Sequence, residues 1–543
     1  MRWIIIYSLF ICLVAAELNI PELLKNEKFK GSGVKARLSP KGINYVSSFL
    51  TNALITELVT VSINTAPVKI PTTTGDLLVN DMILGIHHAP KAIETGLMSP
   101  NIVKLRVKAL NISAKAILGG VFRGDALILA PNVQADLNVG ILKNFQGAPN
   151  LKIKSCKIVQ NTPLTVTMPE GPAKVSLIRE SPELLHSLLC SRVEFIIEER
   201  INARFGLLNP KVPLANINDD VIVNDLIDKM RLVRRQRDLN FERSSRVPRD
   251  SLISSFNVTR AENLALDYTI ISDMRVTPIG LEIENSGEVS LRGRGGTPFG
   301  PVPVALPKNG HPSTMLQMVV SDFVPNSLMY HGHTIGLFST RIDPTTPHFG
   351  PLMQTTCSLS SGTFFCLGDL FPTLKRLHPN QKLSLMFNTV QAPVIRFRSH
   401  EDGGIKFTLL GSIGISLLQG NKETSIAKMS IDVDANMKLR LTASTVRPKI
   451  TLKTISLKTL SPGVLLQKEL DDSVLLAREV LQRLVNDILK EGIPIPVHPL
   501  FKLQKPKVKV INRALLLQTN FILNERLLRQ LTAADLRKRV IRA

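Results

Sequence analysis

The sequence contains few aromatic residues, few cysteines and no long hydrophobic run beyond its first residues. Aromatic side chains make up 5% of the 543 positions, and cysteines number five. After an apolar run that ends at Leu13, no stretch approaches the roughly 20 apolar residues that a membrane-spanning helix needs. This pattern favours a cleaved leader over a membrane anchor.

Catalytic and metal-binding motifs are also missing. No Gly-x-Ser-x-Gly elbow occurs, and no cysteine pair has the Cys-x2-Cys spacing of zinc sites. His87-His88 and His331-Gly-His333 lack further spaced ligands, and the glycines of 293–296 run into Pro298 instead of a helix. We predict that the protein is not an enzyme and has neither metal nor cofactor. The histidines are then structural or solvated, and the glycines form a turn.

The first sixteen residues have the layout of a secretory signal peptide. Arg2 is a positive n-region, Trp3 to Leu13 is apolar, and small residues end at Ala16. The sequence therefore predicts a secreted, extracellular protein with residues 1–16 as its signal peptide. Sequons at Asn111 and Asn257 predict glycans in that compartment. Nucleic acid is not an expected partner there, although the formal net charge is +23.

Four cysteines remain after the leader: Cys156, Cys190, Cys357 and Cys366. Their even number fits disulfides, which persist outside the cell. The stretch CSLSSGTFFC predicts a bridged hairpin, because a turn at Ser361-Gly362 sets its two end cysteines opposite each other. They would form a narrow pair with Cα atoms about 4.5 Å apart. A longer loop joining the same two cysteines is the alternative.

A segment rich in arginine divides the chain near its middle. Residues 231–250 hold seven arginines and three acids and show no apolar periodicity. Because 543 residues exceed one ordinary core, we predict two domains, 17–229 and 253–523, joined by a linker at 230–252. The Arg-x-x-Arg pattern at 234–237 also matches a proprotein-convertase cleavage site. A linker without processing is the favoured interpretation.

Most of the remaining pattern has a period of two, which is typical of half-buried strands. In 431–443, apolar residues alternate with Asp, Asn, Lys, Arg and Thr, and 105–109 alternates in the same way. Long amphipathic strands predict strongly curved antiparallel sheets.

Four helices are expected between the strands, at 39–58, 181–206, 321–332 and 472–490. The first two begin with Ser39 and Ser181 as N-cap candidates, each followed by proline. Each half of the chain then repeats strand, helix, a set of strands, long helix and closing strand. This order indicates a duplicated architecture.

Four features carry a resemblance to a known family. They are GVKARLSPKGINYVSSFL (33–50), the pair Cys156 and Cys190, QMVVSDFVPNSLMYHGHTIGL (317–337) and EGIPIPVHPLFKLQKPKVKVINRALLLQTNF (491–521). Together they resemble the family of bactericidal/permeability-increasing protein, which also contains lipopolysaccharide-binding protein and the phospholipid and cholesteryl ester transfer proteins. The resemblance runs in order over nearly the whole chain after the leader.

This resemblance implies an α+β fold, an elongated boomerang of two β-barrel-like domains, each with long helices, joined by a central antiparallel sheet. It also implies a disulfide between Cys156 and Cys190 and, in each barrel, an apolar pocket that holds a phospholipid or another acyl-chain lipid. Ordinary barrel core is the alternative role for the candidate pocket residues, which are Val46, Phe49, Leu50, Leu54, Leu185, Leu189, Val193 and Ile197.

We therefore expect a secreted lipid-binding or lipid-transfer protein. The alternative is an antibacterial or lipopolysaccharide-binding pattern-recognition protein of innate defence. The balance of 24 basic and 19 acidic residues in 17–229 disfavours that alternative. The basic C-terminal tail, 524–543, is interpreted as a solvated tail, with an amphipathic helix on a membrane or lipoprotein surface as the second interpretation.

Overall fold

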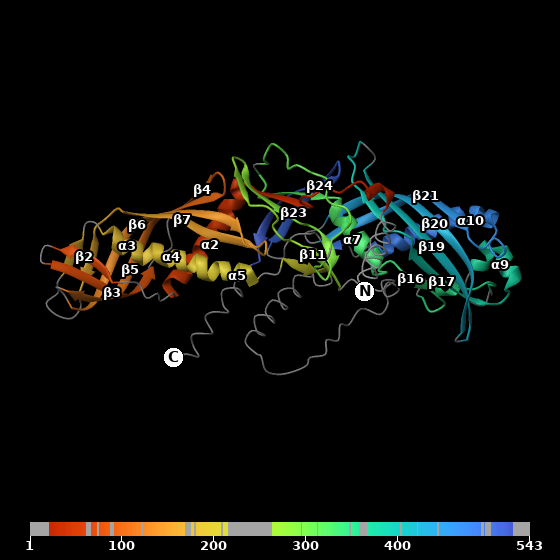
Figure 1. The fold of residues 1–543 in the computed structure, drawn as a ribbon, viewed down its shortest axis with the longest axis horizontal. Coiled ribbons are helices and arrows are strands. Elements are labelled where there is room, and N and C mark those ends of the chain that lie inside the picture. Colours follow the sequence, from red (N-terminus) through yellow and green to blue (C-terminus); the bar gives the residue numbers. More distant parts are fainter. Residues whose placement is uncertain are drawn as a thin grey trace, which may run out of the picture.

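The computed structural model is an elongated molecule in which two curled antiparallel sheets flank a central sheet (Figure 1). It describes residues 21–60, 67–72, 75–86, 92–120, 123–168, 175–178, 181–207, 210–214, 263–294, 296–311, 313–346, 349–357, 366–401, 404–420, 422–441, 445–489, 493–494 and 501–524. The predicted signal peptide and linker, His87, His88, Asn257 and the tail after Asn524 lie outside these residues. Within them, no helix has both the length and the hydropathy needed to cross a bilayer.

The N-terminal sheet follows the order β2-β3-β5-β6-β8-β9, with β4 paired to β5 and β7 paired to β6. Its strands are β2 (Val68–Thr72), β3 (Gly75–Ile86), β4 (Ala92–Met98), β5 (Ile102–Gly120), β6 (Gly124–Lys143), β7 (Pro149–Gln160), β8 (Leu164–Thr167) and β9 (Val175–Ile178). The alternation predicted for 105–109 is confirmed as far as Val107, which is buried beside exposed Arg106, and breaks at Ala109, whose φ of 56° lies in a bulge. Register shifts along β5 and β6 bend these long strands and curl the sheet around its apolar face.

Two helical segments pack on that apolar face. The first is α2 (Pro40–Thr60), and the second joins α3 (Pro182–Leu185), η2 (His186–Cys190), α4 (Ser191–Phe195), η3 (Ile196–Ile201) and α5 (Asn202–Leu207). Ser39 caps α2 as predicted, because its Oγ accepts a hydrogen bond from the Gly42 N–H at 3.3 Å. The predicted cap at Ser181 is wrong in this respect, because that side chain makes no capping bond.

The C-terminal sheet follows the order β16-β17-β19-β20-β21-β22, with β18 paired to β19. Its strands are β16 (Thr340–Ile342), β17 (Lys382–Thr389), β18 (Val394–Arg396), β19 (Ile405–Gln419), β20 (Lys422–Leu441), β21 (Thr445–Thr459) and β22 (Ile493–Pro494). The predicted alternation along β20 is confirmed, with Ile431 and Val433 buried and Asp432 and Asp434 exposed.

Short helices lie at the outer end of this sheet, and one long helix runs beside it (Figure 1). The short ones are η7 (Gly350–Leu352), α8 (Leu367–Leu370) and α9 (Pro372–Leu377). The long one, α10 (Gln467–Leu489), begins five residues earlier than the predicted 472–490. The extra N-terminal turn of α10 is held by the side chain of Gln467, which bonds to the backbone of Leu457 and Thr459 in β21.

The central sheet contains strands from both halves of the chain. Its order is β12 (Arg275–Thr277), β13 (Gly280–Asn285), β1 (Val34–Leu38), β15 (Leu316–Ser321), β24 (Ala514–Leu523) and β23 (Phe501–Ile511). β1, from the beginning of the chain, therefore lies between strands that follow the predicted linker. A smaller sheet likewise pairs β10 (Lys211–Pro213) with β11 (Leu264–Asp267) and then β14 (Val289–Leu291). η1 (Glu22–Leu24) and α7 (Phe323–Thr334) pack beside this region, and α7 begins two residues after the predicted start.

The edges of β7 and β21 are covered in the same way. Asn202 of α5 donates from Nδ2 to the Leu151 carbonyl and accepts from its N–H. Asn486 of α10 makes the same two bonds to Ile450. A helical asparagine thus replaces the next strand at each edge, which protects it from pairing with another chain. This repeated device agrees with the duplicated architecture expected from the sequence.

Both cysteine pairs lie at disulfide distance. Cys156 on β7 and Cys190 on η2 have Cα atoms 5.8 Å apart, so this bridge joins the strand to the helix. Cys357 and Cys366 have Cα atoms 5.6 Å apart, wider than the narrow pair that we predicted but within the disulfide range. Residues 358–365 between them lie outside the described residues, so the hairpin register stays a prediction.

Candidate functional site

The interior of the N-terminal barrel is an apolar core between the curled sheet and the two helical segments. The four candidates of the second segment, Leu185, Leu189, Val193 and Ile197, are all buried in this core. Leu54 of α2 belongs to it as well. The structure therefore brings five of the eight predicted lipid-contact residues together.

The other three candidates lie elsewhere along α2. Val46 and Phe49 are half-buried and pack against the cluster under the central sheet. Leu50 is half-buried. The reason is the path of α2, which leaves the central sheet after β1 and enters the main apolar core of the barrel only with Leu54 and Leu58, in its C-terminal half. The eight candidates consequently do not form one lining, which a helical period alone could not reveal.

The second helical segment contains two π-helical turns. One spans His186–Cys190 and includes Leu189, and the other spans Ile196–Ile201 and includes Ile197. π-turns are rare and are found frequently at functional sites, because the wider turn costs stability in an ordinary helix. Here both lie where the segment faces the apolar core. The sequence carries no signal by which we could have predicted them.

Arg192 is a functional candidate that sequence reasoning missed. Its residue is fully buried between the two π-turns, and Nη2 donates to the carbonyl of Met82 on β3. Burial lowers the pKa of its guanidinium. In the sequence, Arg192 stands four residues from both Leu188 and Ile196, so it falls on the apolar stripe of the helix. A cation on an apolar stripe was the feature by which the sequence could have singled it out.

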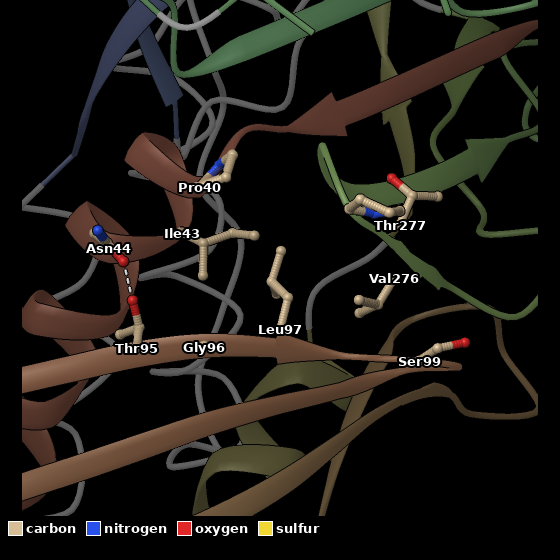
Figure 2. Close-up of a pocket in the computed structure, with 10 residues that line it drawn as sticks. Pro40, Ile43, Asn44, Thr95, Gly96, Leu97, Ser99, Val276 and Thr277 are labelled. Atoms are coloured by element: carbon tan, nitrogen blue, oxygen red, sulfur yellow. Dashed lines mark hydrogen bonds between the residues drawn. The ribbon is translucent and has the colours of Figure 1, made fainter. Parts of the chain in front are cut away.

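A pocket of about 480 Å³ lies where α2 begins, between β4 and β12 (Figure 2). Figure 2 shows Ile43, Leu97 and Val276 directed toward one another across it, and Asn44 bonded to Thr95 at its rim. Its lining contains no charged side chain. The arrangement suits a small apolar or neutral group and has no acid–base chemistry.

A second pocket, of about 560 Å³, is lined by Asn263, Leu291, Arg292, Arg294 and Ile335. Arg292 donates from Nε to Asn263 Oδ1 at 3.0 Å, so one of its two arginines is tied to the pocket wall. None of the eight candidates lines either pocket.

The other predicted polar positions give no catalytic arrangement. His331 is buried against the Tyr330 ring, and burial lowers its pKa. His333 Nδ1 lies 2.6 Å from Thr389 Oγ1, and burial lowers its pKa too. Gly293, with φ of +69°, forms the predicted turn.

Among the described residues, one group has metal-ligand proximity: Cys357, Cys366 and Asp369. Its two sulfurs are joined to each other. Lys375 donates to Asp369 at 2.9 Å and lowers the pKa of that carboxyl. The carboxylate is thereby engaged by a cation of its own chain.

Asn111, the described sequon, lies half-buried on β5. Its Oδ1 accepts a hydrogen bond from the Asn132 N–H at 3.0 Å. Its glycosylation stays a prediction.

Comparison with known proteins gives the relationship. Residues 259–523 match the model of the LBP / BPI / CETP family, C-terminal domain. The C-terminal part of the chain, residues 259–523, therefore carries the C-terminal domain of the LBP / BPI / CETP family. The α+β architecture with curled sheets is the one expected for this family, and the family comprises lipid-binding or lipid-transfer and lipopolysaccharide-binding proteins.

Solved structures show more distant likeness. The crystal structure of lipopolysaccharide binding protein is 15% identical, with 91% of this chain and 100% of that chain covered and a TM-score of 0.43. P47 of Clostridium botulinum E1 is 10% identical, with 91% and 100% covered and a TM-score of 0.25. Takeout 1 of Epiphyas postvittana is 13% identical, with 30% and 81% covered and a TM-score of 0.18. No curated protein sequence matches the chain.

Proposed function

We propose that this protein is a secreted lipid-binding or lipid-transfer protein of the LBP / BPI / CETP family that holds phospholipid-like ligands in apolar barrel interiors. The observation that carries the proposal is the apolar N-terminal interior closed by a helical segment with two π-turns. Burial of acyl chains there is favoured by about 0.8 kcal/mol per CH2 group. Binding of this kind needs almost no polar chemistry.

The helical segment is the wall that a ligand must displace. The Cys156–Cys190 bridge and the bond from Arg192 to the Met82 carbonyl hold the middle of the segment. Its end is held by Asn202 of α5, which bonds to the backbone of Leu151 on β7. The second π-turn, 196–201, lies between these fixed points and carries Ile197 on its inner face. We propose that acyl chains enter beside this turn.

A tryptophan placed in this wall tests the proposal. The chain has a single tryptophan, Trp3, inside the proposed signal peptide. Mature protein therefore has no tryptophan fluorescence of its own. Leu189→Trp reports from the core, and Phe195→Trp is the matched control because Phe195 is 38% exposed on the same segment. Phosphatidylcholine brominated on its acyl chains should quench the first tryptophan and leave the second nearly unchanged.

Equal quenching of both tryptophans, or none of either, would count against an internal lipid. A thermal melt of each variant checks folding. Because a tryptophan could itself fill the site, Ile197→Trp repeats the measurement from the second π-turn.

The alternative function, recognition of bacterial lipopolysaccharide with antibacterial activity, is favoured by the net charge of +23. The described outer end of the N-terminal barrel does not share that excess. Lys69 is bonded to Asp76 there, and Arg123 precedes β6 by one residue, with Asp125 at the start of that strand. We therefore keep lipid binding as the primary function. Titration with purified lipopolysaccharide, alongside phospholipid vesicles, separates the two.

A further inference from the structure

Helix α2 is joined to other elements by polar contacts near both of its ends. Near its beginning, the Tyr45 hydroxyl accepts a hydrogen bond from the Leu523 N–H of β24 at 3.2 Å. Near its end, the Glu57 carboxylate accepts one from Arg200 Nη1 of the second π-turn at 3.1 Å. One end of α2 is therefore fixed on the central sheet, and the other is joined to the second helical segment.

The Glu57–Arg200 ion pair, which we name the clasp, is largely withdrawn from water. The exposed fractions of the two side chains are 15% and 19%. The guanidinium carbon also lies 5.9 Å from the centroid of the Phe195 ring. An ion pair screened in this way holds two elements together more strongly than a fully exposed pair does.

The clasp lies at the margin of the contact between the two helical segments, which run side by side in the N-terminal barrel (Figure 1). Leu54 stands three residues before Glu57, and Ile196 stands four residues before Arg200. Both apolar residues belong to the barrel core. Because residues three or four apart share a helix face, the clasp and the core contact occupy the same seam.

Of the two walls of this seam, α2 has the greater freedom to move. The second segment is bound to the sheet by the Cys156–Cys190 bridge and by Asn202. The twelve residues from Tyr45 to Glu57 span roughly 18 Å, so a rotation of about 15° around the fixed end of α2 moves the Glu57 carboxylate by about 5 Å. That displacement breaks the clasp and parts the seam.

We propose that the clasp controls the passage of acyl chains between α2 and the second helical segment. This inference rests on the proposed function, since it concerns the route into the same barrel interior. The clasp is closed when the barrel is empty and when it is filled, and it is open only during passage. It therefore slows entry and release by the same factor and leaves the affinity for lipid unchanged.

Exchange of pyrene-labelled phosphatidylcholine between the loaded full-length protein and vesicles tests the clasp. Glu57→Gln/Arg200→Gln should exchange lipid about tenfold faster and hold the same amount at equilibrium. Changing both residues leaves no unpaired charge in the seam. The control is Arg106→Gln/Asp136→Asn, which removes an arginine–carboxylate pair from the outer face of the same barrel and should leave the exchange rate unchanged.

The sign of the charges gives a second test. Arg200→Glu sets two carboxylates against each other and should exchange lipid faster still. Adding Glu57→Arg to it restores an ion pair and should slow exchange again. Without any lipid, amide hydrogen exchange in residues 196–201 should be faster in Glu57→Gln/Arg200→Gln than in the wild type, and unchanged in the control.

The possible failures are distinguishable. Wild-type protein that takes up no phosphatidylcholine would overturn the proposed function and this inference with it. Normal loading, with equal exchange rates in the clasp variant and the control, would overturn the clasp alone. Altered loading at an unchanged rate would also overturn it, because the pair would then belong to the ligand site instead of its entrance.

Discussion

Arg513 joins three segments that are far apart in the sequence. From the β23–β24 turn, its Nε and Nη2 donate to both oxygens of Asp322 at 2.7 and 3.0 Å, and Nη1 and Nη2 donate to Glu27 at 2.9 Å. Arg396 adds a third cation contact to Glu27. Burial works against the charge of Arg513, but the bonds to Asp322 and Glu27 raise its pKa; burial raises the pKa of Asp322.

Removal of this guanidinium should be strongly destabilising. The Asp322 side chain is 1% exposed, so Arg513→Ala leaves a buried carboxylate without its partner. We expect a loss of about 3–5 kcal/mol in the free energy of unfolding, measured by denaturant titration. The double variant Arg513→Ala/Asp322→Asn should lose less than the two single changes combined. Simple additivity would contradict the coupling.

The buried histidines of α7 should make stability depend on pH. Burial lowers the pKa of His331 and His333 below the ordinary 6.5, so the unfolded chain takes up protons first as pH falls. Stability is complete above about pH 7 and is lost as pH falls through 6.5 toward the folded pKa values. His331→Gln/His333→Gln should flatten the Tm profile over this window, whereas exposed His400→Gln should not. An unchanged slope in the double variant would refute the assignment.

At the residue scale, the sequence predicted positions set by local rules and missed those set by tertiary contact. Ser39 was visible as a cap because it stands just before Pro40 and the apolar stripe. The sequence could not show which core Phe49 packs against, because the apolar stripe of α2 contacts two different cores along its length. Arg192 is another such case, since only the fold shows which carbonyl it reaches.

At the scale of elements, the two helical asparagines are the most specific contacts. Asn202→Ala and Asn486→Ala each remove two backbone bonds from a strand edge. We expect each change to cost about 1–3 kcal/mol and to increase aggregation on heating. Gln419→Ala, at an exposed hairpin position, is the control. A cost for either asparagine no larger than that of the control would show that helix packing alone protects these edges.

The two disulfides should differ in their contribution because they close loops of different length. Cys156 and Cys190 are separated by 34 residues, and Cys357 and Cys366 by 9. On the chain-entropy model, Cys156→Ser/Cys190→Ser should cost about 3–4 kcal/mol and Cys357→Ser/Cys366→Ser about 2–3 kcal/mol. Denaturation midpoints of the two double variants check this order. The reverse order would indicate that local contacts outweigh loop closure.

Element types were readable from the sequence for a physical reason. Long strands repeat one period over many residues, as in β20, and the exposed or buried state of each residue follows from it. The π-turns and the Glu57–Arg200 pair were hidden, because the first depend on the register within a helix and the second on the register between two helices. Neither register is encoded by the period of the sequence alone.

At the scale of the whole molecule, the two halves are joined through a shared sheet. β1 pairs with β13 and β15, and the short β10 pairs with β11, so each of these two sheets joins one strand of the first half to strands of the second. The two outer sheets can therefore keep separate apolar interiors while the centre holds their relative position (Figure 1). This organisation agrees with the fold that the family resemblance implied.

Native mass spectrometry of the full-length protein, purified from the medium of secreting cells, tests lipid binding most directly. The account predicts a mass excess of phospholipid size that organic extraction removes and that incubation with phosphatidylcholine vesicles restores. A folded protein at its bare polypeptide and glycan mass, before and after vesicle incubation, would contradict it.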